Sequence, residues 1–299
     1  MKHVSDLRKR RDDLVREVLD KQRVLIASHR GSAAGNIVQN TVNAFTAALR
    51  QGAHIIECDV SASTDGELFV FHDGGERTAF GIEHNIATLS SGEVRRLRYY
   101  NPIGARTDQA VQSLSEVLQA MKDKALINID RGWDHWFAIM EEVDRHGMAE
   151  QVIFKSFVDK RLLDRLSALP RDYLYMPIVH SADEIETVLS YELNLLGIEV
   201  VFRSGSDAIV APQRLAQLRD RGLLLWGNAI RLNDVDRLAD KYDDVTSILQ
   251  DPDLGWGKLI DMGFTIIQTD WPTLLRDYLA ARGISSAPVW PTQSAEIRT

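Results

Sequence analysis

The 299-residue sequence contains a single cysteine, Cys58, which excludes a disulfide within the chain. No uninterrupted apolar segment approaches the roughly 20 residues of a membrane-spanning helix, so we expect no membrane insertion. Basic residues are outnumbered, with 35 Lys and Arg against 43 Asp and Glu and a net charge of −8. This balance argues against nucleic-acid binding. Residues 1–23 are densely charged and lack the apolar core of a secretory signal, so we expect a cytoplasmic protein.

Apolar, strand-like runs alternate with helix-like segments along most of the chain. Eight such runs begin near residues 24, 54, 125, 151, 174, 197, 223 and 264. Alternation of strands and helices favours parallel pairing, and eight units are typical of an α/β fold of the (β/α)8, or TIM, barrel type. A doubly wound open sheet is the alternative. No glycine-rich dinucleotide-binding pattern follows any of the runs, because the glycines within 31–35 have the wrong spacing.

The alternating region predicts a single barrel domain over residues 23–283. An N-terminal helical extension at 1–22 precedes it, and a tail at 284–299 that contains Pro, Ser and Thr follows it. The charged segment 5–21 has an incomplete apolar stripe, which predicts a helix that plugs or flanks the barrel. A contact between two copies of the chain, as in a homo-oligomer, stays open.

The second apolar run carries two carboxylates that share one face. Glu57 and Asp59 are two residues apart in a strand, so their side chains point to the same side. Neighbouring carboxylates repel each other unless a proton or a cation lies between them, and hard oxygen ligands suit Mg²⁺ or Ca²⁺. Asp130 ends the next parallel run and could supply a third carboxylate. The alternative is that Glu57 or Asp59 caps a helix or forms an ion pair.

Two histidines also end apolar runs. His29 and His72 are candidates for general acid and base, because imidazole titrates near neutral pH. Arg30, beside His29, is placed to bind an anion with its forked donors. The alternative for each histidine is a hydrogen-bonded structural role. Taken together, these residues suggest acid/base chemistry on an anionic substrate, most simply a phosphate ester, with a divalent cation.

These motifs resemble those of the glycerophosphodiester phosphodiesterase family, and the likeness runs in order along most of the chain. The matching motifs are His29-Arg30-Gly31, Asn40-Thr41, Glu57-Cys58-Asp59, Asp65-Gly66, His72-Asp73, Ile127-Asn128-Ile129-Asp130, the segment 152–157, Leu225-Trp226 and the segment 267–272. The resemblance implies a TIM barrel that hydrolyses a small-molecule phosphodiester with one bound divalent cation, Mg²⁺ or Ca²⁺. By the same resemblance, Glu57, Asp59 and Asp130 would be metal ligands, His29 and His72 acid and base, and Arg30 a phosphate ligand.

The sequence departs from the family pattern at three positions near the expected site. Gln39 stands where Glu is usual, Asp130 where a longer Glu is usual, and Gly132 where Lys is common. Lys155, near the end of the next strand, is our candidate for the missing cation of the phosphate site. The alternative for Lys155 is a surface or helix-facing position.

The departures leave the substrate open. Trp226 and Trp271 are placed near strand ends, where their rings could line a substrate pocket, and Glu199 could accept hydrogen bonds from substrate hydroxyls. The tryptophans favour a sugar phosphodiester of the agrocinopine kind as an alternative to a glycerophosphodiester. A non-catalytic barrel that binds a phosphorylated ligand also stays open, as does a membrane-active phospholipase. The phospholipase would need an exposed apolar loop, for which Phe80 and Tyr99-Tyr100 are the candidates.

Overall fold

Eight parallel strands close into a barrel in the computed structural model, which describes residues 2–169 and 171–286. In spatial order they are β1 (Leu25–Ser28), β2 (Ile55–Ala62), β4 (Leu126–Asp130), β5 (Val152–Phe157), β6 (Leu174–Val179), β7 (Gly197–Val200), β8 (Leu224–Asn228) and β9 (Ile266–Thr269). Strand β1 pairs with both β2 and β9, which closes the ring. The predicted TIM barrel is therefore confirmed, and the open-sheet alternative is wrong. Strand β3 (Leu68–Val70) pairs antiparallel with β2.

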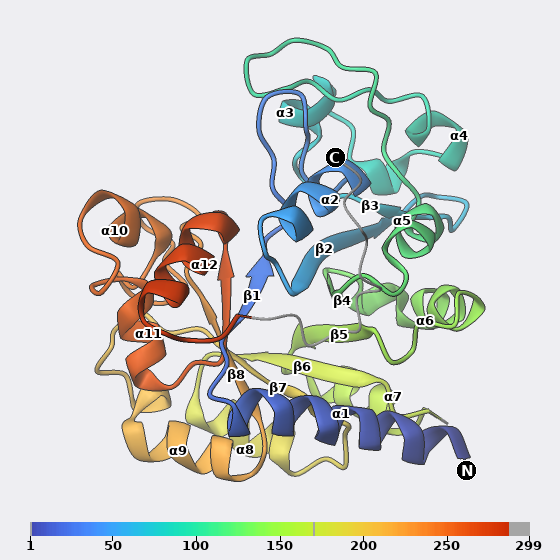
Figure 1. Ribbon diagram of the computed structural model, residues 1–299. Helices are drawn as coiled ribbons and strands as arrows, with labels where there is room; N and C mark the ends of the chain where they lie inside the picture. The colour runs from blue at the N-terminus through green and yellow to red at the C-terminus, as the bar shows by residue number, and fades with distance from the viewer. Residues whose placement is uncertain (1, 170, 287–299) are drawn as a thin grey trace.

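Helices surround the barrel and cover its outer face (Figure 1). They are α2 (Val42–Arg50), α5 (Leu114–Met121), α6 (Trp136–Arg145), α7 (Lys160–Ser167), α8 (Ala182–Leu189), α9 (Pro212–Asp220), α10 (Asp244–Leu249), α11 (Trp256–Met262) and α12 (Pro272–Ala281), with short 3₁₀ turns η2 (Trp133–His135) and η3 (Ala208–Val210). Helix α2 begins at a side-chain N-cap, because the Thr41 hydroxyl accepts a hydrogen bond from Ala44 N at 3.2 Å. Between strands and helices lies one continuous apolar core, to which Ile56, Cys58 and Val60 of β2 contribute.

The amino-terminal end of the barrel is closed by α1 (Lys2–Asp20), which lies across the bottom of the molecule (Figure 1). Leu14, Val15 and Val18 of α1 belong to the same buried apolar cluster as the inward-facing residues Leu25 and Leu126. The incomplete apolar stripe of the sequence therefore marks a plug, as one of the two predicted arrangements required. Burial of these side chains removes apolar surface from water at the amino-terminal end of the barrel interior.

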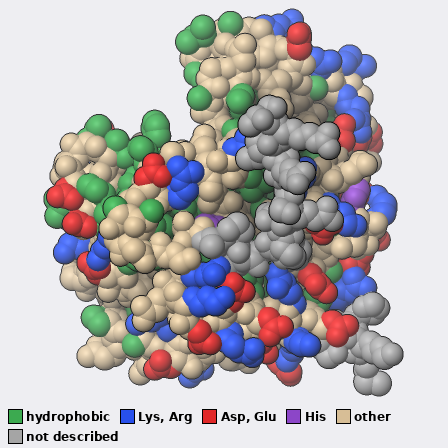
Figure 2. All heavy atoms as spheres, in the orientation of Figure 1, with side chains coloured by type: hydrophobic (Ala, Val, Ile, Leu, Met, Phe, Trp, Pro, Cys, Tyr) green, Lys and Arg blue, Asp and Glu red, His purple; other side chains and the backbone are tan. Residues whose placement is uncertain are grey.

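A long insertion between β3 and α5 stands beside the carboxyl ends of the strands. It contains α3 (Glu76–Phe80), η1 (Ile86–Thr88) and α4 (Ser91–Val94). It has an apolar cluster of its own, built from Phe69, Phe71, Phe80, Ile86, Val94, Tyr99 and Val111. Figure 2 shows a hollow between the part of the molecule that carries α3 and the part that carries α10 and α12. The carboxyl ends of the strands, where barrel enzymes place their sites, point towards this hollow.

Within the described residues, no helix is both long enough and apolar enough to cross a membrane. The predicted division into residues 1–22, 23–283 and 284–299 stays a prediction. Most of the predicted tail, residues 287–299, lies outside the described residues.

Candidate active site

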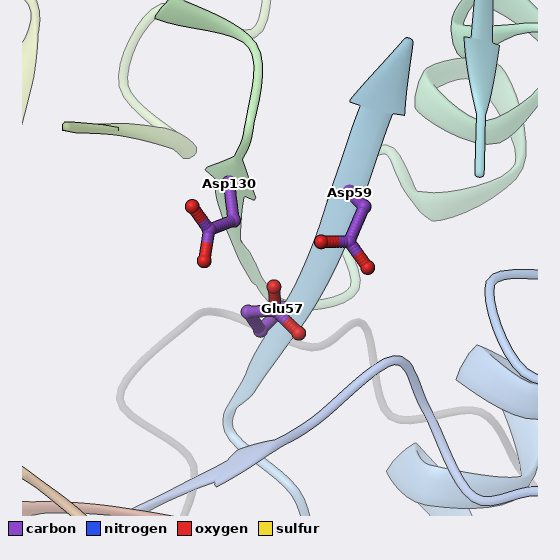
Figure 3. Close-up of side chains that lie close together, drawn as sticks. All are labelled: Glu57, Asp59 and Asp130. Carbon is purple, nitrogen blue, oxygen red and sulfur yellow. The ribbon is translucent and has the colours of Figure 1, made fainter. Parts of the chain in front are cut away.

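Three carboxylates converge at the carboxyl end of the barrel. Glu57 and Asp59 come from β2, and Asp130 is the last residue of β4, where it lies opposite Asp59 in the parallel register. Oxygen atoms of the three side chains lie within 4.8 Å of one another. Figure 3 shows the carboxylates of both strands turned towards a common space. The structure therefore brings together the three residues that were expected to hold a cation.

Two residues in left-handed backbone conformations hold the β2 carboxylates in place. Arg30 has φ +53° and donates its backbone N–H to Glu57 Oε2 at 3.0 Å, while its guanidinium Nε lies 2.9 Å from Asp59 Oδ2. Asn40 has φ +57° and donates from Nδ2 to the same Asp59 oxygen at 2.9 Å. Such conformations cost free energy in residues other than glycine and persist where surrounding contacts enforce them. The loop between β1 and α2, which carries both residues, is thus shaped around the carboxylates.

The glycine of the His-Arg-Gly motif has a packing reason. Gly31 has φ +75°, and a Cβ at this position would lie 2.7 Å from the backbone carbon of Ala44 in α2. Only glycine allows this approach without moving the helix. The close contact fixes the loop that carries His29 and Arg30.

Burial and like charge act on the carboxylate cluster. Burial, and then the negative charge of Asp59, raise the pKa of Glu57 well above its usual range. Burial would also raise the pKa of Asp130, but the ammonium of Lys155 outweighs it and holds the pKa of Asp130 below its usual value. The cluster therefore holds more negative charge than its surroundings neutralise.

Lys155 of β5 points into the barrel, and it is 2% exposed. Its Nζ lies 3.0 Å from Asp130 Oδ2 and 2.8 Å from Glu199 Oε2. Burial opposes the charged form, but these carboxylates raise the pKa of Lys155 above its usual value. The surface or helix-facing alternative for Lys155 is therefore wrong. Glu199 also accepts a hydrogen bond from Asn228 Nδ2 at 2.8 Å, so both predicted substrate ligands are engaged with other side chains.

The two tryptophans that were expected to line a substrate pocket lie in different environments. Trp226 lies within β8 rather than after it and is fully buried, with its Nε1–H donated to Asn228 Oδ1 at 3.0 Å and Gln268 Oε1 at 3.1 Å. The expected substrate contact of Trp226 therefore needs correction, because the inner face of the strand places its ring in the barrel interior, with Lys155 Nζ 5.6 Å from the ring centroid. Trp271 follows β9 and is 53% exposed, a position open to solvent.

His29 is oriented by a carboxylate from the other end of the sequence. Its Nδ1 lies 2.9 Å from Asp270 Oδ1, at the end of β9, which leaves Nε2 for proton transfer. Burial would lower the pKa of His29, but the hydrogen bond to Asp270 and the charges of Glu57 and Asp270 raise it above its ordinary value. Sequence reasoning did not assign this role to Asp270. The signal was present, because Asp270 ends an apolar run as Asp130 does.

Asp270 is itself held by a buried carboxylate. Asp244, in α10, accepts hydrogen bonds from Asp270 N at 2.9 Å, Thr269 Oγ1 at 2.7 Å and Trp256 Nε1 at 2.7 Å. Burial raises the pKa of Asp244 to about 7, although these donors act in the opposite direction. Helix α10 thus supports the backbone that presents Asp270 to His29.

His72 follows β3 and lies at the base of the insertion. It shares with Arg30 and Asn40 the wall of a cavity of about 850 Å³ between the 33–40 loop and the insertion. Asp73, the next residue, pairs with Arg131 at 3.1 Å, which ties the end of β3 to the end of β4. The expected acid/base residue therefore opens onto a space that could accommodate a substrate.

The described side chains fit a divalent cation by charge and by donor type. When all four carboxylates are ionised, they face two basic groups, which leaves two negative charges; the carboxylates are Glu57, Asp59, Asp130 and Glu199, and the bases are Arg30 and Lys155. Asn128 lies beside Glu57 in the register, and its buried amide has no hydrogen-bond partner among the described residues. Hard oxygen donors around uncompensated negative charge are what Mg²⁺ and Ca²⁺ require.

Comparisons with known proteins give relatives over most of the chain. A human lysophospholipase D is 25% identical over 282 residues, which cover 87% of this chain and 88% of the relative. A probable glycerophosphodiester phosphodiesterase of Mycobacterium tuberculosis is 25% identical over 271 residues, with 86% and 90% coverage. A family model described as a domain of unknown function matches residues 175–279.

Solved structures agree on the fold. A glycerophosphoryl diester phosphodiesterase from Parabacteroides distasonis superposes with a TM-score of 0.74 at 14% identity, covering 92% of this chain and 94% of that one. The Oleispira antarctica phosphodiesterase in complex with the product sn-glycerol-3-phosphate has a TM-score of 0.64 at 18% identity, with 88% and 99% coverage. At these identities the likeness concerns the barrel architecture.

The barrel, the site at its carboxyl end and these relatives define a phosphoric diester hydrolase. Within that class, the resemblance to the glycerophosphodiester phosphodiesterase family that the sequence motifs indicated is confirmed by curated relatives and solved structures of that name, which match most of the chain.

Proposed function

We propose that this protein hydrolyses a glycerophosphodiester to an alcohol and a phosphomonoester, with one divalent cation and two histidines. The observation that carries the proposal is the convergence of Glu57, Asp59 and Asp130 within 4.8 Å at the barrel mouth. The names of the relatives support the substrate class. The product complex of the Oleispira antarctica enzyme is consistent with a small-molecule substrate.

The proposed reaction assigns each proton to a named group. One histidine, His29 or His72, accepts a proton from the attacking oxygen, which is either water or a neighbouring substrate hydroxyl. The new P–O bond forms as the bond to the leaving alcohol breaks, and the other histidine donates the proton that the leaving alkoxide needs. Asp270 holds the ring of His29 through Nδ1, so that Nε2 faces the reaction. If a substrate hydroxyl attacks first, water then opens the cyclic phosphate.

The basic side chains and the cation would share the neutralisation of the negative charge at the site. A divalent cation held by Glu57, Asp59 and Asp130 would withdraw negative charge from the phosphoryl oxygens. Arg30 lies at the wall of the cavity and can turn its remaining guanidinium N–H groups towards phosphate. Lys155 is fixed between Asp130 and Glu199, so we propose that it sets the charge of the cation site.

A sugar phosphodiester of the agrocinopine kind stays a weaker alternative. Trp226 is buried, which removes one of the two aromatic rings on which that alternative depended, and Trp271 alone stands exposed. A non-catalytic barrel would not need the His29–Asp270 contact, which orients the ring of His29 and leaves its other nitrogen free for proton transfer.

Phosphorus NMR of the purified protein with glycerophosphocholine tests the proposal. We expect conversion to a phosphomonoester with Mg²⁺ or Ca²⁺ and loss of conversion after chelation. Glu57→Gln should weaken cation binding by at least about tenfold, because it removes a charged oxygen ligand. Glu141→Gln, an exposed carboxylate of α6, is the matched control and should behave as wild type. Turnover that persists in chelator, or no turnover with either cation, would contradict the proposal.

The cytoplasmic location and a homo-oligomer stay predictions from the sequence. So does the choice between Mg²⁺ and Ca²⁺, which the same NMR experiment addresses by titrating each cation separately.

A further inference from the structure

The neighbouring strands β2 and β4 present their inward-facing side chains in matched pairs. From the amino-terminal end of the barrel to its mouth, the pairs are Ile55 with Leu126, Glu57 with Asn128, and Asp59 with Asp130. The first pair belongs to the apolar cluster that α1 closes. Above it, the other two pairs place four oxygen-bearing side chains in two rows of two. Three of the four are the carboxylates of the cation cluster, and the fourth is Asn128.

The amide of Asn128 is buried without a partner. Its side chain is 0% exposed, and neither Oδ1 nor Nδ2 has a hydrogen-bond partner within residues 2–169 and 171–286. A buried amide costs free energy unless another group satisfies it, so nearly all such groups in native proteins are paired. An unpaired amide on the inner face of the barrel therefore points to a ligand that binds there.

A second buried asparagine inside the barrel shows the usual arrangement. Asn228 of β8 is 1% exposed, and both ends of its amide are engaged. Its Nδ2 donates to Glu199 Oε1 at 2.8 Å, and its Oδ1 accepts from Trp226 Nε1 at 3.0 Å. Asn128 thus resembles Asn228 in burial but lacks such contacts among the described residues.

The neighbours of Asn128 indicate what its oxygen can bind. Glu57 is its partner in the register and contributes to the carboxylate cluster shown in Figure 3. Side-chain carbonyl oxygens of asparagine are regular ligands of Ca²⁺, which takes about six to eight oxygen ligands. A neutral oxygen adds a ligand without adding to the like-charge repulsion that already raises the pKa of Glu57.

We propose that the side-chain oxygen of Asn128 is a fourth protein ligand of the divalent cation, beside Glu57, Asp59 and Asp130. The inference rests on the proposed function, because it adds a ligand to the cation site of that reaction. The unpaired amide is then a cost of the cation-free protein that cation binding removes.

Calorimetric titration of Ca²⁺ into the chelator-treated protein tests the assignment without turnover. Asn128→Leu keeps a side chain of similar size but removes the oxygen, so it should weaken Ca²⁺ binding by about tenfold or more. Asn128→Asp keeps an oxygen ligand and should bind Ca²⁺ at least as tightly as wild type. Unchanged binding in Asn128→Leu, or an equal loss in both variants, would overturn the inference.

Urea denaturation without cation separates a ligand from a structural residue. Asn128→Leu should raise the urea midpoint, because an apolar side chain replaces an unpaired buried amide. Asn228→Leu is the matched control and should lower the midpoint, because it removes the hydrogen bonds to Glu199 and Trp226. A midpoint that falls as far in Asn128→Leu as in Asn228→Leu would assign Asn128 to the fold and contradict the proposal.

Turnover distinguishes failure of this inference from failure of the proposed function. If wild type cleaves glycerophosphocholine with Ca²⁺ and Asn128→Leu binds Ca²⁺ as wild type does, the proposed function stands and this inference is overturned. If Asn128→Leu binds Ca²⁺ more weakly but wild type cleaves no glycerophosphodiester, the ligand assignment is supported and the proposed function is overturned.

Discussion

The two halves of the barrel mouth use charge in different ways. On the side of β1 to β3, Arg30, Asn40 and His72 line a cavity that opens to solvent. On the side of β5 to β8, Lys155 and Glu199 are buried and bonded to each other. The polar side chains of the first half can contact a ligand, whereas the charged side chains of the second half are paired with each other.

This difference explains how a barrel can hold many polar residues and yet confine its chemistry. A buried charge costs free energy unless it is paired, so the inner face of the second half is a closed network of ion pairs and hydrogen bonds. The first half leaves donors and an acidic cluster whose charge is uncompensated. That imbalance is where a cation and a phosphodiester can gain binding free energy.

Removal of the histidines should have the largest effect on activity. Both histidines belong to the first half of the barrel mouth, so this prediction tests that half alone. His72→Ala and His29→Ala should each lower kcat by about 10²–10⁴-fold, because each removes a proton-transferring group. His72 is only partly buried, so unfolding by urea should change little in that variant. Phosphorus NMR rates with glycerophosphocholine measure the first quantity. Wild-type rates in both variants would show that the first half is not catalytic.

Substitution of Lys155 should destabilise the ion-pair network of the second half. Lys155→Met leaves Asp130 and Glu199 without their shared cation, which should reduce the free energy of unfolding by about 3–5 kcal/mol. Urea denaturation without added cation measures this loss.

Two further variants make this prediction specific. Lys155→Met with Glu199→Gln should recover part of the stability, because an unpaired charge is removed with its partner. Arg30→Met, in the first half, should cost only about 1–2 kcal/mol. Equal losses for Arg30→Met and Lys155→Met would remove the distinction between the two halves.

The positions of the strands and of the cation cluster could be predicted from the sequence because both depend on local patterns. Apolar runs locate the strands, and the two-residue alternation places Glu57 and Asp59 on one face. Alternation also puts Lys155 on the inner face of β5. Its contact with Glu199 could not be predicted, because it depends on how closely β5 and β7 approach each other across the barrel interior. Trp226 was misplaced because its position near the end of a strand does not show whether the ring lines a substrate pocket or packs inside the barrel.

Contacts that form when the barrel closes could not be predicted from the sequence. His29 and Asp270 are 241 residues apart and meet because β1 pairs with β9. Asp244, the first residue of α10, reaches Asp270 from the long connection between β8 and β9, whose path has no periodic signal in the sequence. Such contacts follow from the closed barrel and from loop conformations, so they need the three-dimensional structure.

Of the substitutions of the histidines, Lys155 and Asp270, Asp270→Asn should have the smallest effect. It tests whether Asp270, which follows β9, supports catalysis by His29 in the first half of the barrel mouth. The amide keeps a hydrogen-bonding oxygen near His29 Nδ1 but removes the negative charge that favours the imidazolium, so the pKa of His29 should fall. Whichever limb of the kcat/KM profile reports His29 should therefore move to lower pH. This holds whether His29 acts as the base or as the acid, because deprotonation occurs earlier in either case.

The rate at the optimum of the Asp270→Asn variant should fall by about 10–100-fold, as when the carboxylate that orients a functional histidine is lost. A pH–rate profile of kcat/KM from pH 5 to 10, measured for wild type and variant at saturating cation, checks both expectations. Asp277→Asn, an exposed carboxylate of α12 paired with Arg276, is the control and should leave the profile unchanged. A loss of rate with no displacement of either limb would mean that Asp270 only positions the ring and does not set its charge.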